Sequence, residues 1–299
     1  MICYAVKKLQ YNLMLMKYLV QLKKYLFFTS LFMTFVVGSY DFSHARSYAK
    51  LLINSSGKVL YDENADQEMY PASITKLATL YLVFEALKNN KISFDTSLSI
   101  SKKAAAMPRS SIGLKHWHTI TVEEAILSLI VSSANDSAVV LAENLAGTEA
   151  AFAYRMNQKA KQLGMKKTNF TNASGWHHPQ QKTTAYDLAK LAIALKRDFP
   201  EYYHLFSRTS FSYRNTVFRG HNHVLNNLRG AQGLKTGYTS KAGWNIVTAA
   251  KRGGTALIGI ILGGKSYKSR DAEMINMMNT YFNKKTLYTS LNNKKANLG

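Results

Sequence analysis

The chain has 299 residues, a formal net charge of +22 and a single cysteine, Cys3. One cysteine at the N-terminal end excludes a disulfide-bonded scaffold and a thiol nucleophile in the body of the chain. The excess of basic residues favours anionic partners, but no recognised nucleic-acid motif accompanies it, so we predict no nucleic-acid partner.

The N-terminal segment has the layout of an export signal. A basic stretch ending at Lys24 runs into an apolar segment at 25–38, and small residues follow at Ser43 and Ala45. The apolar run is too short to span a membrane comfortably, so we predict a signal peptide over 1–45 with cleavage after Ala45. An uncleaved N-terminal anchor is the alternative. Both interpretations place the body of the chain outside the cytoplasm.

Beyond this leader, apolar periodicity and turn residues predict a series of short elements. Two strands at 49–54 and 59–61 form an opening hairpin around a Ser-Ser-Gly-Lys turn. Apolar residues at helical spacing then predict helices at 73–87, 122–130, 137–145, 150–163 and 184–195. β-Rich runs bounded by glycines follow at 211–218, 244–250 and 256–262, and a last helix is expected at about 269–282.

Strands at both chain ends around a helical middle indicate an α+β fold, with an antiparallel sheet built from both chain ends and a helical subdomain. We expect one folded domain over 46–283 and a polar, lysine-rich tail over 284–299. The apolar face of this tail is too weak for a membrane-seeking helix. No C-terminal membrane anchor is therefore expected.

Ser73 and Lys76 are the first candidate site residues, because a helix starting at Ser73 places both on one face. A serine is a poor nucleophile until a base takes its proton, and a lysine three residues later lies within reach. The start of the helix adds exposed N–H groups that can help to stabilise an oxyanion. The pair therefore has the parts of an activated nucleophile.

Two further motifs complete the pattern. Ser133 and Asn135 fall in a short break between two predicted helices, where both side chains can point into a cleft. Lys235, Thr236 and Gly237 follow one another in a glycine-containing segment that lets a ligand approach a strand edge. Each motif is common alone. In this order, with separations of about 60 and about 100 residues, the three form a specific signature.

With these motifs the chain resembles the low-molecular-weight penicillin-binding proteins, which are serine-type D-alanyl-D-alanine carboxypeptidases. The resemblance covers most of residues 49–282, and it is most evident at 71–79, 164–170, 172–187, 233–245 and 263–273. It implies a β-lactamase/D,D-peptidase-like fold and an exported, periplasmic or wall-facing enzyme. That enzyme would remove the terminal D-alanine from peptidoglycan pentapeptides, without a metal or organic cofactor, and β-lactams would inhibit it covalently.

The resemblance also implies a role for each catalytic residue. Ser73 would attack the peptide carbonyl, Lys76 would act as its base, and Lys235 would help to lower the pKa of Lys76. Ser133 would relay a proton towards the leaving amine. Asn135 would hydrogen-bond the substrate amide and steady Lys76.

Substrate recognition follows from the same resemblance. The oxyanion hole would consist of the backbone N–H groups of Ser73 and Tyr238. A guanidinium group suits a planar carboxylate, so Arg270 would bind the free C-terminus of the substrate together with Thr236. The complete set of substrate-binding residues would be Lys235, Thr236, Gly237 and Arg270.

Other functions remain open on the same motifs. A class A β-lactamase needs a glutamate that activates water, but no glutamate lies between Glu149 and Glu201. Asp187, which lies in this region, is expected to cap a helix with Thr184. A D,D-endopeptidase acting on cross-links is the main alternative, and Arg270 disfavours it because a cross-link has no free carboxylate at the scissile residue.

A non-catalytic penicillin-binding wall module is a further alternative, but it would be expected to lack Ser73, Lys76 or Lys235. Three histidine pairs have no third ligand at a recognised spacing, so we predict loop or surface histidines and no metal site. These pairs are His116/His118, His177/His178 and His221/His223.

Overall fold

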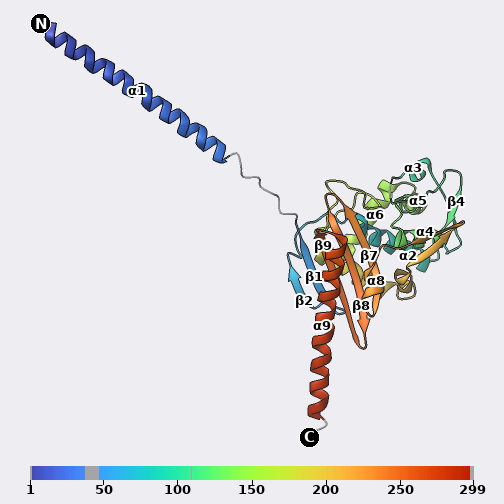
Figure 1. Cartoon of the computed structure of the whole chain (residues 1–299). Helices are drawn as coiled ribbons and strands as arrows, with labels where there is room; N and C mark the ends of the chain where they lie inside the picture. The colour runs from blue at the N-terminus through green and yellow to red at the C-terminus, as the bar shows by residue number, and fades with distance from the viewer. Residues whose placement is uncertain (1, 38–46, 109, 297–299) are drawn as a thin grey trace. The chain divides into compact units, whose positions relative to one another are not determined.

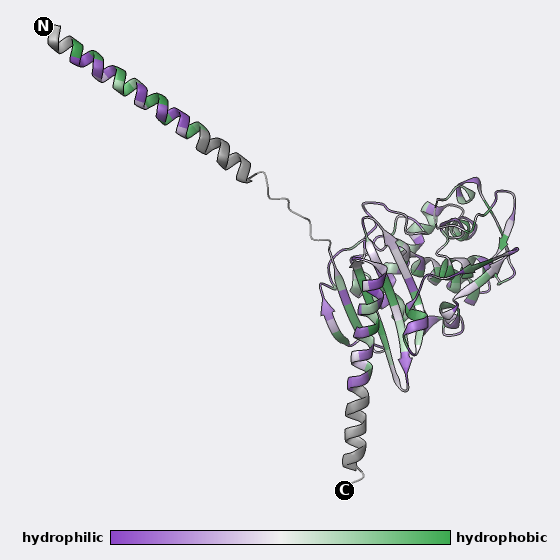
Figure 2. Cartoon of the chain, viewed as in Figure 1, coloured by the Kyte–Doolittle hydropathy of each residue, from purple (hydrophilic) through white to green (hydrophobic). Residues whose placement is uncertain are grey.

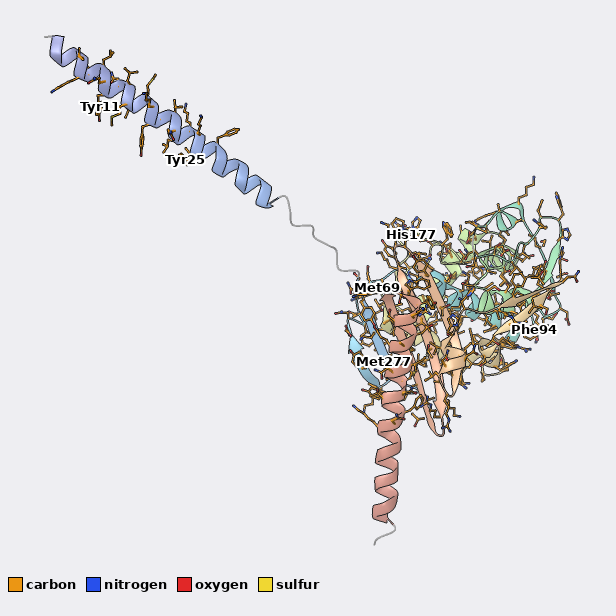
Figure 3. The ribbon with its side chains drawn as sticks, viewed as in Figure 1. Tyr11, Tyr25, Met69, Phe94, His177 and Met277 are labelled. Atoms are coloured by element: carbon orange, nitrogen blue, oxygen red, sulfur yellow. The ribbon has the colours of Figure 1, made fainter. Side chains whose placement is uncertain are left out.

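The computed structural model describes residues 2–37, 47–108 and 110–296, and the chain divides into two compact units, Met1–Ala45 and Arg46–Gly299. The first unit contains the helix α1 (Ile2–Val37), along which Tyr11 and Tyr25 project into solvent (Figure 3). Hydrophilic and hydrophobic residues are interspersed along the coloured part of this helix (Figure 2). Within the described residues, no helix combines the length and apolarity needed to cross a membrane. Ala45 lies outside the described residues, so signal-peptide cleavage stays a prediction.

A five-stranded antiparallel sheet is the centre of the second unit (Figure 1). Its strand order is β2-β1-β9-β8-β7, and the pairing of Ala49 with Leu262 joins the two ends of the domain. The α+β prediction, with strands drawn from both chain ends, is confirmed. The strands are β1 (Ala49–Asn54), β2 (Val59–Glu63), β7 (Ala231–Thr239), β8 (Gly243–Arg252) and β9 (Thr255–Gly264).

The five predicted helices of the middle region are present, with ends shifted by a few residues. They are α2 (Lys76–Lys88), α4 (Val122–Val131), α5 (Asn135–Ala146), α6 (Glu149–Gln162) and α7 (Ala185–Asp198). Shorter helical pieces are η1 (Ala72–Thr75), α3 (Lys102–Ala105), η2 (Tyr203–Ser207) and α8 (Val224–Asn227). Two small antiparallel pairs complete the region, β3 (Ser97–Ser99) with β4 (Thr119–Thr121) and β5 (Ser210–Tyr213) with β6 (Thr216–Arg219).

Two expectations for the C-terminal half need correction. The β-rich run at 211–218 is a hairpin, because the chain turns at Arg214, whose φ of 49° is left-handed. The last helix, α9 (Tyr267–Ala296), starts earlier than predicted and continues through most of the segment at 284–299. No proline or glycine interrupts that segment before its end, so nothing in the sequence stops the helix.

The two faces of the sheet bury different residues, as the two-residue period of strands requires. On β1, Leu51 and Ile53 pack into the helical core, whereas Leu52 packs beneath α9. Figure 1 shows α9 against the sheet and α4 to α6 grouped beyond the other face, and Figure 3 marks Met277 on α9. At Gly259 an added Cβ would lie 2.6 Å from Met274 Sδ, so this glycine lets α9 approach β9 closely.

The helix α7 has the expected N-terminal cap at Thr184, but Thr184 and Asp187 do not form a complete capping box. The Thr184 hydroxyl accepts a hydrogen bond from the backbone N–H of Asp187 at 3.1 Å. The Asp187 carboxylate accepts from the backbone N–H of Lys167 and from the side chains of Thr168 and Lys190. This carboxylate therefore ties a loop to the helix, in keeping with the structural role expected for it.

Candidate active site

Ser73 and Lys76 meet at the start of α2, as their spacing predicted. Ser73 lies in the single turn η1, and Lys76 is the first residue of α2. Lys76 Nζ lies 3.0 Å from Ser73 Oγ, within hydrogen-bonding distance. The candidate nucleophile and its candidate base are therefore in hydrogen-bonding contact.

Lys76 is fully buried, and its ammonium group has three partners. Besides Ser73, Nζ donates to Asn135 Oδ1 at 2.8 Å and to the backbone carbonyl of Ser174 at 2.5 Å. Burial lowers the pKa of Lys76 well below its usual value, the charge of Lys235 lowers it further, and Asp136 opposes this change. A lysine in this environment can hold a free amine and accept a proton.

The second motif lies in the break between α4 and α5, as expected. The break is tight, since Ser133 has a left-handed φ of 59° and Asn135 already begins α5. A capping box between Thr121 and Glu124 fixes the start of α4, the helix that leads to this break. Within the described residues, no hydrogen bond joins Ser133 to Ser73 or Lys76. The proton relay predicted for Ser133 therefore has no direct hydrogen bond to Ser73 or Lys76 in this structure.

The third motif occupies β7, the strand at the edge of the sheet next to η1. Lys235 is only 2% exposed, and its Nζ donates to the carbonyl of Thr236 at 2.9 Å. Burial, followed by the charge of Arg270, lowers the pKa of Lys235 to about 7. At Gly237 an added Cβ would lie 3.0 Å from the backbone N of Ser73, so this glycine permits the strand to lie against η1.

Arg270, in the first turn of α9, is also buried at 2% exposed. Its Nε and Nη2 donate to Asp271 Oδ1 at 2.9 and 2.6 Å, and its Nη1 donates to the carbonyl of Asn245 at 3.1 Å. Burial lowers the pKa of Arg270, and Asp271 opposes that change. The guanidinium group is thus held in a fixed orientation at one end of the cleft.

These elements surround a cleft of about 400 Å³. Of the predicted site residues it is lined by Ser73, Ser133, Thr236, Gly237, Tyr238 and Arg270. Lys76, Asn135 and Lys235 are buried behind these residues. The structure therefore brings the predicted residues into one site. Their catalytic and binding roles remain predictions.

The cleft has five further lining residues that the sequence did not predict as catalytic or substrate-binding: Ser110, His221, His223, Trp244 and Tyr267. The histidine pair was expected on a loop or the surface, and its loop indeed borders the cleft. Trp244 supports Tyr238 by ring stacking, with centroids 4.1 Å apart. The Ser174 carbonyl was also missed, because a backbone acceptor leaves no signature in residue type. Within the part of the chain that the structure describes, no three His, Cys, Asp or Glu residues cluster as a metal site would require.

A serine in contact with a buried lysine, beside the edge strand of an antiparallel sheet, defines a site suited to serine acyl transfer. Residues 39–266 match the family Peptidase_S11, D-alanyl-D-alanine carboxypeptidase. The chain belongs to this family.

Individual relatives agree. D-alanyl-D-alanine carboxypeptidase DacF of Bacillus subtilis is 32% identical over 251 residues, which cover 81% of this chain and 63% of that relative. The chain thus spans less than two thirds of that protein's length.

Solved structures are also similar. Penicillin binding protein 5 from Haemophilus influenzae matches with a TM-score of 0.76 and 34% identity, over 78% of this chain and 70% of that chain. Penicillin-Binding Protein D2 from Listeria monocytogenes, in its ampicillin-bound form, matches with a TM-score of 0.72 and 32% identity, over 78% of this chain and 96% of that chain.

Proposed function

We propose that this protein is a serine D,D-carboxypeptidase that removes the terminal D-alanine from peptidoglycan pentapeptides. The observation that carries the proposal is the 3.0 Å contact between Ser73 Oγ and the buried Nζ of Lys76. Burial favours the free amine, which is the form that can take the serine proton. Family membership supports the same substrate class.

In the acylation step, Ser73 Oγ attacks the carbonyl carbon between the two D-alanines while its proton passes to Lys76 Nζ. The backbone N–H groups of Ser73 and Tyr238 stabilise the oxyanion of the tetrahedral intermediate. The C–N bond then breaks. Ser133 delivers its hydroxyl proton to the leaving amine of D-alanine and takes in its place the proton that Lys76 received from Ser73, so Lys76 returns to the free amine. Water hydrolyses the resulting ester and restores the Ser73 hydroxyl. All of these groups belong to the protein, so the proposed reaction requires no cofactor.

Recognition of the substrate's free carboxylate is assigned to Arg270 and Thr236, which both line the cleft. A buried guanidinium binds a carboxylate more strongly than an exposed one, because water competes less. Lys235 adds a second positive charge nearby. This cationic end supports the carboxypeptidase over the D,D-endopeptidase, whose cross-linked substrate lacks the terminal carboxylate.

The same site is proposed to react with β-lactams, which would acylate Ser73 as substrate mimics. The ampicillin-bound form of the similar Listeria protein supports this inference. We also propose that the enzyme acts outside the cytoplasm, facing the wall, since the leader has a signal-peptide layout. Cleavage after Ala45 would remove five lysines and one aspartate, and the remaining net charge of +22 − 5 + 1 = +18 would favour retention at an anionic wall.

Competition between two substrates tests the choice of reaction. The purified protein is incubated with a D-Ala-D-Ala pentapeptide and with a cross-linked muropeptide dimer, and the products are separated by chromatography. The proposal predicts D-alanine release from the pentapeptide at a rate at least about tenfold above dimer cleavage, the discrimination one charged contact provides. Faster cleavage of the dimer would favour the endopeptidase instead.

A further inference from the structure

The buried carboxylate of Asp136 lies beside the site and has no role in the proposed acylation and hydrolysis steps. Asp136 is the residue after Asn135 at the start of α5, and it is 1% exposed. Its charge acts on Lys76 in the direction opposite to that of Lys235. The carboxylate therefore belongs to the electrostatic environment of the proposed base, although it does not line the cleft.

Most of the hydrogen bonds of Asp136 converge on residues 110–114, here called the wall segment because Ser110, at its start, lines the cleft. Oδ2 accepts from three consecutive backbone N–H groups at 3.0, 3.1 and 3.2 Å, those of Ile112, Gly113 and Leu114. Oδ1 accepts from the backbone N–H of Ser137 at 2.9 Å. One carboxylate thus joins the wall segment to the first turn of α5.

Asn135 holds the same wall from its other side. Its backbone N–H donates to the carbonyl of Ser110 at 2.6 Å, and its Nδ2 donates to the carbonyl of Pro108 at 3.2 Å. Its Oδ1 is the acceptor for Lys76 Nζ. Asp136 therefore holds the wall segment by accepting hydrogen bonds from it. Asn135 donates to the carbonyls of Ser110 and Pro108 and accepts from Lys76.

We propose that Asp136 is a positioning residue for acylation, which anchors the wall segment so that Asn135 and Lys76 keep their alignment with Ser73. This inference rests on the proposed function, because acylation of Ser73 is the step that it serves. Asp136 itself contacts neither the nucleophile nor the substrate space.

A carboxylate suits this position better than an amide. The four N–H donors divide between both carboxylate oxygens, whereas an asparagine has only one acceptor oxygen and would direct its NH₂ group at a backbone N–H. The four backbone donors favour the ionised form of Asp136, while burial acts the other way and raises its pKa. Replacement by asparagine therefore removes both an acceptor and the negative charge near Lys76.

The sign of the expected pH effect follows from the charges around Lys76, which are Lys235 on β7 and Asp136 on α5. Asp136 stabilises the ammonium form, so its loss lowers the pKa of Lys76 further. In the Asp136→Asn variant, the free amine of Lys76 would then be present at lower pH than in the parent. The ascending limb of the acylation rate against pH should move to lower pH, which a loss of folding stability alone would not cause.

The test compares Asp136→Asn with Asp187→Asn in the full-length chain. Asp187 is a matched control, because it is a buried carboxylate that accepts a backbone N–H outside the cleft. The second-order rate constant for acylation by fluorescent penicillin is measured from pH 5 to 9, at a temperature where each variant is folded. We expect Asp136→Asn to lower the rate by about 30- to 100-fold and to shift the limb to lower pH, and Asp187→Asn to do neither.

The inference would be overturned if Asp136→Asn were acylated as fast as Asp187→Asn, or if the ascending limb of its pH profile did not move. In either case, acylation of the parent by penicillin would leave the proposed function intact. A parent that penicillin does not acylate would reject both. If Asp136→Asn fails to fold, amide hydrogen exchange of the unmutated protein decides. The inference requires Ile112, Gly113 and Leu114 to be protected like the α5 core, and exchange at the rate of an exposed loop would refute it.

Discussion

Lys76 and Lys235 are both buried, and the charge of Lys235 lowers the pKa of Lys76. One lysine begins a helix of the middle region and the other lies on the edge strand, so the fold brings the two ammonium groups near each other. Two like charges in a buried site disfavour each other's protonation. One lysine can therefore act as a base while the other keeps its proton up to about pH 7.

The first prediction concerns the affinity for substrate. The pKa of Lys235 is about 7, so its ammonium form is lost as the pH rises through that value. If this cation helps Arg270 to bind the substrate carboxylate, KM for a D-Ala-D-Ala pentapeptide should rise about tenfold between pH 6 and pH 9. Lys235→Arg, which stays charged, should flatten this rise. A KM of the parent that is independent of pH would contradict the assignment.

The second prediction concerns stability. An unfolded lysine has a pKa of about 10.4, so between about pH 7 and 10 the unfolded chain binds a proton at position 235 that the native protein lacks. Because the unfolded chain binds more protons at position 235 than the native protein, the free energy of unfolding increases with pH over this range. The increase ends above the pKa of lysine in the unfolded chain. Lys235→Met should therefore raise the melting temperature most at pH 6.5, by about 3 °C or more, and progressively less towards pH 10.

The control for this change is Lys58→Met, at an exposed position in the opening hairpin. It should give the same difference from the parent at every pH. A stabilisation by Lys235→Met that does not diminish with rising pH would argue against a buried ammonium group.

The third prediction concerns the substrate's carboxylate. Arg270→Gln removes the buried guanidinium, and we expect kcat/KM for the pentapeptide to fall by about 10- to 100-fold, the worth of one charged hydrogen bond. Hydrolysis of the C-terminally amidated peptide should change little. Arg252→Gln is the control, because Arg252 contacts Arg229 and Asn279 rather than the cleft. Equal losses on both peptides would show that Arg270 acts through the fold.

The fourth prediction concerns the oxyanion hole. In Gly237→Ala the new Cβ would meet the backbone N of Ser73 at 3.0 Å and push β7 away from η1. Acylation by penicillin should slow by about 100-fold, as when one oxyanion donor is displaced. Gly254→Ala adds the same methyl group where no atom lies within 4 Å and should stay within about twofold of the parent. Similar rates for the two variants would place the oxyanion elsewhere.

Local spacing accounts for what the sequence could predict of the site. Ser73 and Lys76 are one helical turn apart, so their contact follows from the helix alone. The positions of Ser133 and Lys235 required the motif order, and that of Arg270 required the family resemblance, because nothing local indicates which distant segments meet. The carbonyl of Ser174 could not be found this way, since any residue supplies a carbonyl.

The errors in the fold have equally local causes. The hairpin of β5 and β6 turns at Arg214 in a left-handed conformation without a glycine, so Asn215 was the one turn-favouring residue at the centre of the run at 211–218. The helix α9 outlasts its apolar stripe because lysine and asparagine do not stop a helix as proline does. Apolar periodicity therefore indicated this helix only as far as Phe282.

The central claim is that Ser73 forms the acyl-enzyme. The most direct measurement treats the parent and Ser73→Ala with penicillin, maps any adduct by mass spectrometry, and follows D-alanine release from the pentapeptide by the same two proteins. The account predicts a penicilloyl adduct on Ser73 and D-alanine release by the parent, with both absent from Ser73→Ala. Release or acylation that survives in the folded Ser73→Ala variant would contradict it.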